Sequence, residues 1–205
     1  QHMSETLQFR STIRGKDIID YVHSGSGSLC RPEFVMNRCQ VTAQFLDAIE
    51  GGGFLATFRH GRGNPNRIFD NLSSEENEDL QLLLRERAFQ HCDKSTRETR
   101  RLNKLYLIFD IKDSRLGDIT EKRALKVISG ASKMAETYYP QLLAKTIILN
   151  CPSWISALMT VARTFLPSKT VKKMCTFTTP AVMWNGKNMR AAPFCCRSSS
   201  SCPSP

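Results

Sequence analysis

Two mostly apolar segments, separated by an interval long enough for a helix, constrain the fold of this chain most strongly. They are Leu105–Ile111 and Thr146–Asn150. A strand that is apolar at successive positions is typically buried on both faces of a sheet. Between the two segments, apolar residues recur at helical spacing from Leu125 to Ala135, and Tyr138–Pro140 closes that helix. Strand, helix and strand of these lengths predict two parallel strands with a right-handed connection, and therefore an α/β domain.

Positive charge is concentrated in the second half of the chain. The net charge is +10, and residues 73–205 hold 21 Lys+Arg against 12 Asp+Glu, a net +9 (21 − 12). No acidic residue follows Glu136. Such a segment favours an anionic partner. Because its basic residues flank an apolar helix rather than exposed aromatic side chains, we expect an anionic membrane surface rather than nucleic acid.

Another helix-sized segment follows the second strand. It is mostly apolar, begins after Cys151-Pro152 and ends at Phe165–Pro167, directly before the basic stretch Lys169–Lys173. With its Tyr-Tyr-Pro, its strand ending in Asn-Cys-Pro and its Phe-Leu-Pro-Ser-Lys-Thr-Val-Lys-Lys, the stretch Tyr138–Met174 resembles the CRAL-TRIO lipid-binding family without a gap over 37 residues. The resemblance implies a mostly parallel sheet with covering helices over residues 73–178.

The same resemblance implies a set of lipid contacts. Thr170 and Lys173 form the Thr-x-x-Lys that members specific for phosphatidylinositol use at the inositol phosphate. A hydroxyl and an ammonium three residues apart on a helix can both donate to a phosphate. Gln141 stands where the family carries a glutamate that pairs with the lysine, so it keeps a hydrogen bond but loses the charge. The implied acyl-chain contacts are Leu107, Phe109, Trp154, Leu158 and Phe165.

Each of these residues also has an ordinary structural explanation. Thr170 can cap a helix while Lys173 is a solvated surface charge, and the residues alone give this alternative equal weight. Apolar stripes on helices usually pack in a core, so any single member of the chain-contact set is more often a core residue. The alternative to a lipid binder is therefore a protein-interaction scaffold with a collapsed lipid cavity.

The first 72 residues suggest a separate unit in front of the lipid module. Capping by Ser73 and Glu76 restarts the helical pattern after it. It begins with a helix at 17–22, a loop at 24–28 and a second helix at Arg31–Ile49. A glycine turn at Gly51–Gly53 and a hairpin of Phe54–Phe58 with Arg67–Phe69 follow. With Phe9 and Gly15 before the first helix, it resembles a DEP domain, a small winged helix (α+β) that implies a protein partner. The alternative is a diverged N-terminal lobe of the CRAL-TRIO module itself.

The two ends of the chain carry no clear element pattern. Residues 1–3 read as a cloning remnant, and residues 179–205 are rich in serine and cysteine without periodicity, which predicts a disordered tail. The family resemblance also implies a strand, a short helix and a final strand in this part of the chain, and only Cys175–Thr178 could serve as the first of them. Cys195, Cys196 and Cys202 lie near arginines, as acylation sites do, although a disordered tail explains them more simply.

Catalysis, a metal and a cofactor are all unsupported by the sequence. It has no Cys-x-x-Cys pair, no histidines at ligand spacing and no phosphate loop. No apolar run is long enough to span a bilayer, and scattered cysteines without a secretion signal predict reduced thiols. We therefore expect a non-catalytic protein that binds or transfers a phospholipid, with a phosphoinositide as the candidate. It would act in signalling as a cytoplasmic, peripheral membrane regulator.

Overall fold

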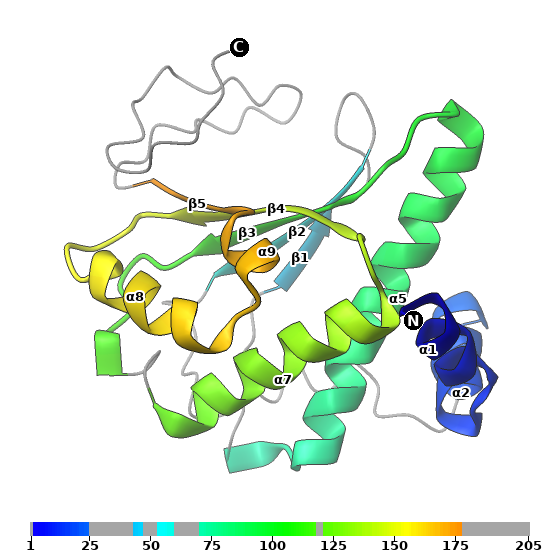
Figure 1. The fold of residues 1–205 in the computed structure, drawn as a ribbon, viewed down its shortest axis with the longest axis horizontal. Helices are drawn as coiled ribbons and strands as arrows, with labels where there is room; N and C mark the ends of the chain where they lie inside the picture. Colours follow the sequence, from blue (N-terminus) through cyan, green and yellow to red (C-terminus); the bar gives the residue numbers. More distant parts are fainter. Residues whose placement is uncertain (1, 25–42, 47–52, 60–69, 118–120, 178–205) are drawn as a thin grey trace.

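The chain is built around one mixed sheet. The computed structural model describes residues 2–24, 43–46, 53–59, 70–117 and 121–177. Within these residues the sheet has five strands in the order β1-β2-β3-β4-β5 (Figure 1). Their bounds are β1 Ala43–Leu46, β2 Phe54–Arg59, β3 Leu105–Asp110, β4 Leu143–Leu149 and β5 Met174–Thr176. β1 is antiparallel to β2, and the other three pairs are parallel.

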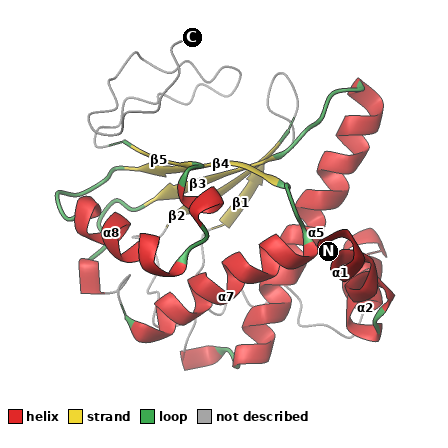
Figure 2. Ribbon diagram, in the orientation of Figure 1, coloured by secondary structure: helices red, strands yellow, loops and turns green. Residues whose placement is uncertain are grey.

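Helices between the parallel strands cover the same face of the sheet (Figure 2). The described helices are α1 His2–Ser11, α2 Ile13–Ser24, α5 Ser74–Thr99, α7 Lys122–Tyr138, α8 Ile155–Phe165 and α9 Ser168–Val171. Alternate residues of a strand share a face, so Leu105 and Phe109 of β3 point to the same side. Leu105 packs in the cluster that includes α5, and Phe109 packs against α8. Both helices therefore lie on that side.

The predicted strand, helix and strand unit is confirmed. β3 and β4 are parallel neighbours, with Leu107 opposite Thr146 and Phe109 opposite Ile148. α7 ends at Tyr138, as the Tyr-Tyr-Pro pattern predicted. β4 begins at Leu143, earlier than predicted, because its first residues include the exposed Lys145, which interrupts the apolar run.

The predicted capping box opens α5. The Ser73 side chain accepts from the backbone N–H of Glu76 at 3.1 Å, and the Glu76 carboxylate accepts from the Ser73 N–H at 2.8 Å. Two of the unpaired N–H groups at the helix start are satisfied in this way. The helix then continues to Thr99, and Arg100 ends it in the left-handed region at φ 55°.

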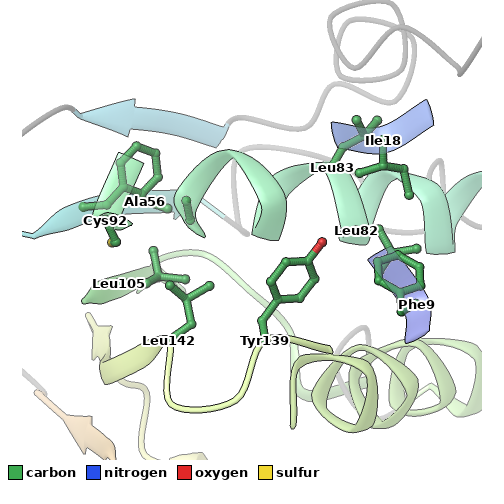
Figure 3. Close-up of a cluster of buried hydrophobic side chains, with 11 residues drawn as sticks. Phe9, Ile18, Ala56, Leu82, Leu83, Cys92, Leu105, Tyr139 and Leu142 are labelled. Atoms are coloured by element: carbon green, nitrogen blue, oxygen red, sulfur yellow. The ribbon is translucent and has the colours of Figure 1, made fainter. Parts of the chain in front are cut away.

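The main core lies between α5 and the sheet (Figure 3). Its buried members are Phe9, Ile18, Phe54, Ala56, Leu82, Leu83, Ala88, Cys92, Leu105, Tyr139 and Leu142. They come from α1, α2, β2, α5, β3 and the turn that follows α7. Figure 3 shows the ring of Tyr139 directed at α5, between Leu142 and Phe9. Residues from both sides of residue 73 share this core. The predicted boundary at residue 73 therefore does not divide the chain into two units with separate cores.

A winged helix in the first 72 residues is not supported. Ala43–Leu46 belongs to the predicted helix Arg31–Ile49, yet it is β1 and pairs with β2. β2 pairs in parallel with β3, so the predicted hairpin partner of Phe54–Phe58 is wrong. The apolar spacing around Phe45 fits a strand as well as a helix, and local sequence does not reveal a partner across the chain. Residues 25–42 and 67–69 lie outside the described residues. The structure favours the alternative, a lobe of the same module.

α1 and α2 form a helical hairpin that packs on α5 and α7. The ring of Phe9 stacks on Tyr138 with centroids 4.2 Å apart. Arg10 makes a two-pronged ion pair with Glu86 of α5, at 2.8 and 3.0 Å. A Cβ atom added to Gly15 would clash with the carbonyl oxygen of Phe9, so only glycine allows the two helices this close. Of the two residues that suggested a DEP domain, Gly15 instead lets α1 and α2 approach each other, and Phe9 joins the hairpin to the main body.

Candidate functional site

Apolar residues of α8 pack on the carboxyl half of β3 and β4. The whole group is called here the α8 cluster. Its buried members are Ile111, Ile148, Cys151 and Ile155, and its partly buried members are Phe109, Trp154, Leu158, Met159 and Met174. The structure thus brings together three of the five predicted chain contacts, Phe109, Trp154 and Leu158. Leu107 packs instead against the main core. Phe165 is the last residue of α8, and its side chain lies outside the described part of the structure.

α8 buries few of its apolar side chains, although it is apolar over most of its length. Among its described residues only Ile155 and Ala162 are buried. Leu158, Met159 and Val161 are half-buried. Trp154, at the N-cap position, is also half-buried. An apolar helix in a finished core normally buries a stripe at every turn. The described residues therefore leave a part of this helix surface uncovered.

Lys173 lies at the other end of the site, directly before β5. Its ammonium Nζ donates to the carbonyl oxygen of Leu143, the first residue of β4, at 2.6 Å. Thr170 is in α9, and its carbonyl accepts from the Lys173 backbone N–H at 3.0 Å. The predicted pair therefore lies on one turn, although α9 ends at Val171 and Lys173 is outside the helix. Met174 of the α8 cluster follows Lys173 in sequence, so the polar and apolar parts of the site adjoin.

Gln141 occupies the turn between α7 and β4. It is exposed and its φ is 64°, a left-handed conformation that favours glycine or asparagine. Among the described residues, the Lys173 ammonium bonds to the Leu143 carbonyl and makes no hydrogen bond to Gln141. The orienting role that the family gives to a glutamate at this position is therefore taken here by a backbone carbonyl.

Tyr139 fixes the start of that turn. It is buried, and its carbonyl accepts from the Leu142 N–H at 3.3 Å. Burial raises the pKa of the Tyr139 phenol above its ordinary value, and the nearby Glu86 carboxylate raises it further. The phenol therefore stays protonated, and the ring anchors the turn to α5.

Lys104 is a residue of this site that the sequence motifs do not include. Burial lowers the pKa of Lys173, and the ammonium groups of Lys104 and Lys169 lower it further because they are close and carry the same charge. Lys104 directly precedes β3, far from Lys173 in sequence. The only signal that could have identified it is its position at the start of β3. That strand is separated from β5, which Lys173 precedes, by β4 alone.

The described residues were compared with the patterns expected for a metal site and for a membrane-spanning helix. They contain no group of three or more His, Cys, Asp or Glu side chains that could hold a metal ion. None of the described helices is long and apolar enough to cross a bilayer. Cys92, Cys151 and Cys175 are free thiols, while Cys30 and Cys39 lie outside the described residues.

Comparison with known proteins gives a matching family and similar solved structures, of which one is described here. The family described as "CRAL/TRIO domain" matches residues 52–181, which include β2 to β5. The crystal structure of Sfh5 matches with a TM-score of 0.65 and 14% sequence identity, over 87% of this chain. The chain spans 59% of that structure's length. No curated protein sequence matches the chain. At this identity the likeness to Sfh5 concerns the fold.

Proposed function

The chain belongs to the CRAL/TRIO domain family, and we propose that it binds one phospholipid without catalysing a reaction. The family match supports lipid binding or transfer in general. The proposal adds a location for each part of the ligand: the acyl chains lie against α8 and the sheet, and the headgroup lies at Thr170 and Lys173. A phosphoinositide is the proposed ligand, because both residues belong to the Thr-x-x-Lys pattern.

The observation that carries this proposal is the unfinished packing of α8. Leu158 and Met159 belong to the α8 cluster. They are only half-buried, although their helix faces the sheet. Covering such side chains with an acyl chain stabilises a complex by roughly 25 cal/mol for each Å² of apolar surface. A hydrocarbon ligand would therefore cover the apolar surface of α8 that the described residues leave exposed.

Lipid extracted from the purified protein and identified by mass spectrometry tests this proposal. We expect one phospholipid for each chain. Leu158→Asp should remove it, because a carboxylate would then meet the acyl chains, whereas Thr160→Asp, at an exposed position of the same helix, should retain it. A protein that carries no lipid and does not take it up from vesicles would contradict the proposal and favour the interaction scaffold.

Lys173→Ala is expected to weaken binding of phosphatidylinositol by about ten- to a hundredfold. One charge-assisted hydrogen bond to a phosphate is worth about 1.5–3 kcal/mol, and an alanine removes it. The fold should lose only about 1 kcal/mol, the usual worth of a bond such as that from Lys173 to the Leu143 carbonyl. Binding to vesicles with and without phosphatidylinositol, together with thermal unfolding, measures both effects.

Two further variants complete this experiment. Lys126→Ala removes an exposed lysine from α7 and should change neither quantity. Gln141→Glu restores the carboxylate that the family carries, and should change headgroup selectivity because it gives the Lys173 ammonium a charged partner. Equal losses in Lys173→Ala and Lys126→Ala would mean that Lys173 is an ordinary surface charge.

We also propose that the protein works at the cytoplasmic, anionic surface of a membrane, as a regulator that exchanges its lipid there. The support is the charge of the last part of the chain, where 8 Lys+Arg and no acidic residue follow Glu136. Binding to anionic vesicles should exceed binding to neutral ones and should fall as salt is raised, because exposed charges are screened over about 10 Å at 0.1 M. Binding that ignores both lipid charge and salt would contradict this part of the proposal.

A further inference from the structure

Three lysines gather where the parallel strands begin. Lys104 directly precedes Leu105, the first residue of β3, and Lys173 directly precedes Met174, the first residue of β5. β4 lies between them and begins at Leu143. Adjacent strands are about 4.8 Å apart, and Met174 is level with Leu107 through Thr146. Lys173 therefore lies two residues further along the sheet than Lys104, and the two backbones are separated by roughly 12 Å. Two lysine side chains can converge over such a distance.

The backbone holds both lysines at this edge. The carbonyl of Lys104 accepts from the Phe54 N–H at 3.1 Å, and the carbonyl of Lys173 accepts from the Thr146 N–H at 2.9 Å. A Cβ atom on Gly53 would approach the Lys104 carbonyl to 2.9 Å, so the glycine allows this close contact. The Lys173 ammonium lies on the Leu143 carbonyl, over the start of the strand between the two. Lys169, in α9, is the third member.

Carboxylates do not neutralise this group within the described residues. None of the ion pairs found there includes Lys104, Lys169 or Lys173. The mutual repulsion is visible in the lowered pKa of Lys173, to which Lys104 and Lys169 both contribute after burial. Like charges brought together without a counter-charge destabilise a fold and attract a multivalent anion.

We propose that Lys104 and Lys169 extend the headgroup site at Lys173, and that the site selects an inositol headgroup carrying a phosphomonoester over phosphatidylinositol itself. This inference rests on the proposed function and specifies its ligand. The phosphodiester that joins a headgroup to its lipid carries one negative charge, whereas a phosphomonoester adds about 1.5 to 2 more at neutral pH. Three ammonium groups exceed what the diester alone can balance and match a headgroup with both groups.

Binding of the full chain to three probes tests this assignment. The probes are vesicles with phosphatidylinositol, vesicles with a phosphatidylinositol monophosphate, and the soluble inositol bisphosphate that corresponds to the second headgroup. We expect the wild type to prefer the monophosphate lipid at least tenfold. Lys104→Gln and Lys169→Gln should each reduce that preference about tenfold, since each loses one charge-assisted contact. Lys126→Gln, on α7, is the control with the same loss of charge and should behave as wild type.

The possible outcomes separate this inference from the proposed function. If the soluble headgroup competes with vesicles for the wild type but not for Lys104→Gln, the site recognises the phosphate groups. Vesicle binding that the soluble headgroup does not reduce would show contact with the bilayer surface and would overturn the inference. A wild type that binds both lipids equally, or a Lys104→Gln variant with an unchanged preference, also overturns it while lipid binding by the α8 cluster stands. The proposed function is contradicted instead by a protein that carries no lipid and takes none up from vesicles.

Discussion

Arg10→Met is expected to destabilise the fold by about 3 kcal/mol, a value typical of removing one partner from a buried ion pair. The Glu86 side chain is 0% exposed, and Arg10 binds both of its carboxylate oxygens, at 2.8 and 3.0 Å. Methionine keeps most of the volume of the arginine stem but leaves the carboxylate buried without its cation, although the Gln90 amide still donates to it at 2.9 Å. Chemical denaturation of the two proteins measures the loss.

The reverse substitution should cost less. Glu86→Met leaves the Arg10 guanidinium without its partner, but 25% of that side chain is already exposed, so the cation can turn to water. The double variant Arg10→Met with Glu86→Met should recover most of the stability, because an apolar pair of similar volume often replaces a buried ion pair without loss. A double variant as unstable as Arg10→Met would show that packing, rather than the buried charge, carries the effect.

Gly15→Ala is the second substitution with a large expected effect, a loss of about 3 kcal/mol at the upper end of the range for overpacking. The added methyl group would overlap with the Phe9 carbonyl oxygen, and backbone atoms cannot turn aside as a side chain can. α1 must then move away from α2, which opens the stack of Phe9 on Tyr138. Thermal unfolding and hydrogen exchange of residues 2–24 measure the two consequences.

Gly130→Ala provides the matched control. Gly130 is in the middle of α7, and no neighbouring atom of the described residues lies within 4 Å of the place that an added methyl group would take. In a helix interior, alanine is about 1 kcal/mol more favourable than glycine. The same chemical change should therefore raise stability at residue 130 and lower it at residue 15. If both substitutions changed stability in the same direction, the close approach of α1 and α2 would not explain the result.

The parts of the fold that sequence predicted are those determined by neighbouring residues. The apolar run at β3, the capping box at Ser73 and the end of α7 at Tyr138 all depend on interactions within a few residues, and the structure contains each of them. The strand Phe54–Phe58 was also recognised as a strand. Its predicted partner, Arg67–Phe69, was wrong. That segment is close in sequence, whereas the actual partner β3 follows only after the 26-residue helix α5.

The candidate site divides in the same way. Thr170 and Lys173 belong to one local pattern and were found from it, while Lys104 reaches the same place only because β3 and β5 flank β4 in the sheet. Leu107 and Phe109 were predicted as one lining, since they alternate on the same face of β3. They belong to different clusters because α5 covers one end of that strand and α8 the other.

The position of α1 also determines when the fold can be completed during protein synthesis. The Thr6 hydroxyl donates to the Thr137 carbonyl at 3.3 Å across a separation of 131 residues, and Phe9 stacks beside that contact on Tyr138. At ribosomal rates of 5–20 residues per second, α1 waits roughly 7 to 26 seconds for these partners to be made. Until Tyr138 has been made, Phe9 lacks the ring on which it stacks and Thr6 lacks its acceptor. α1 is then held only by its contacts with α2 and α5, and it is available to chaperones at the ribosome.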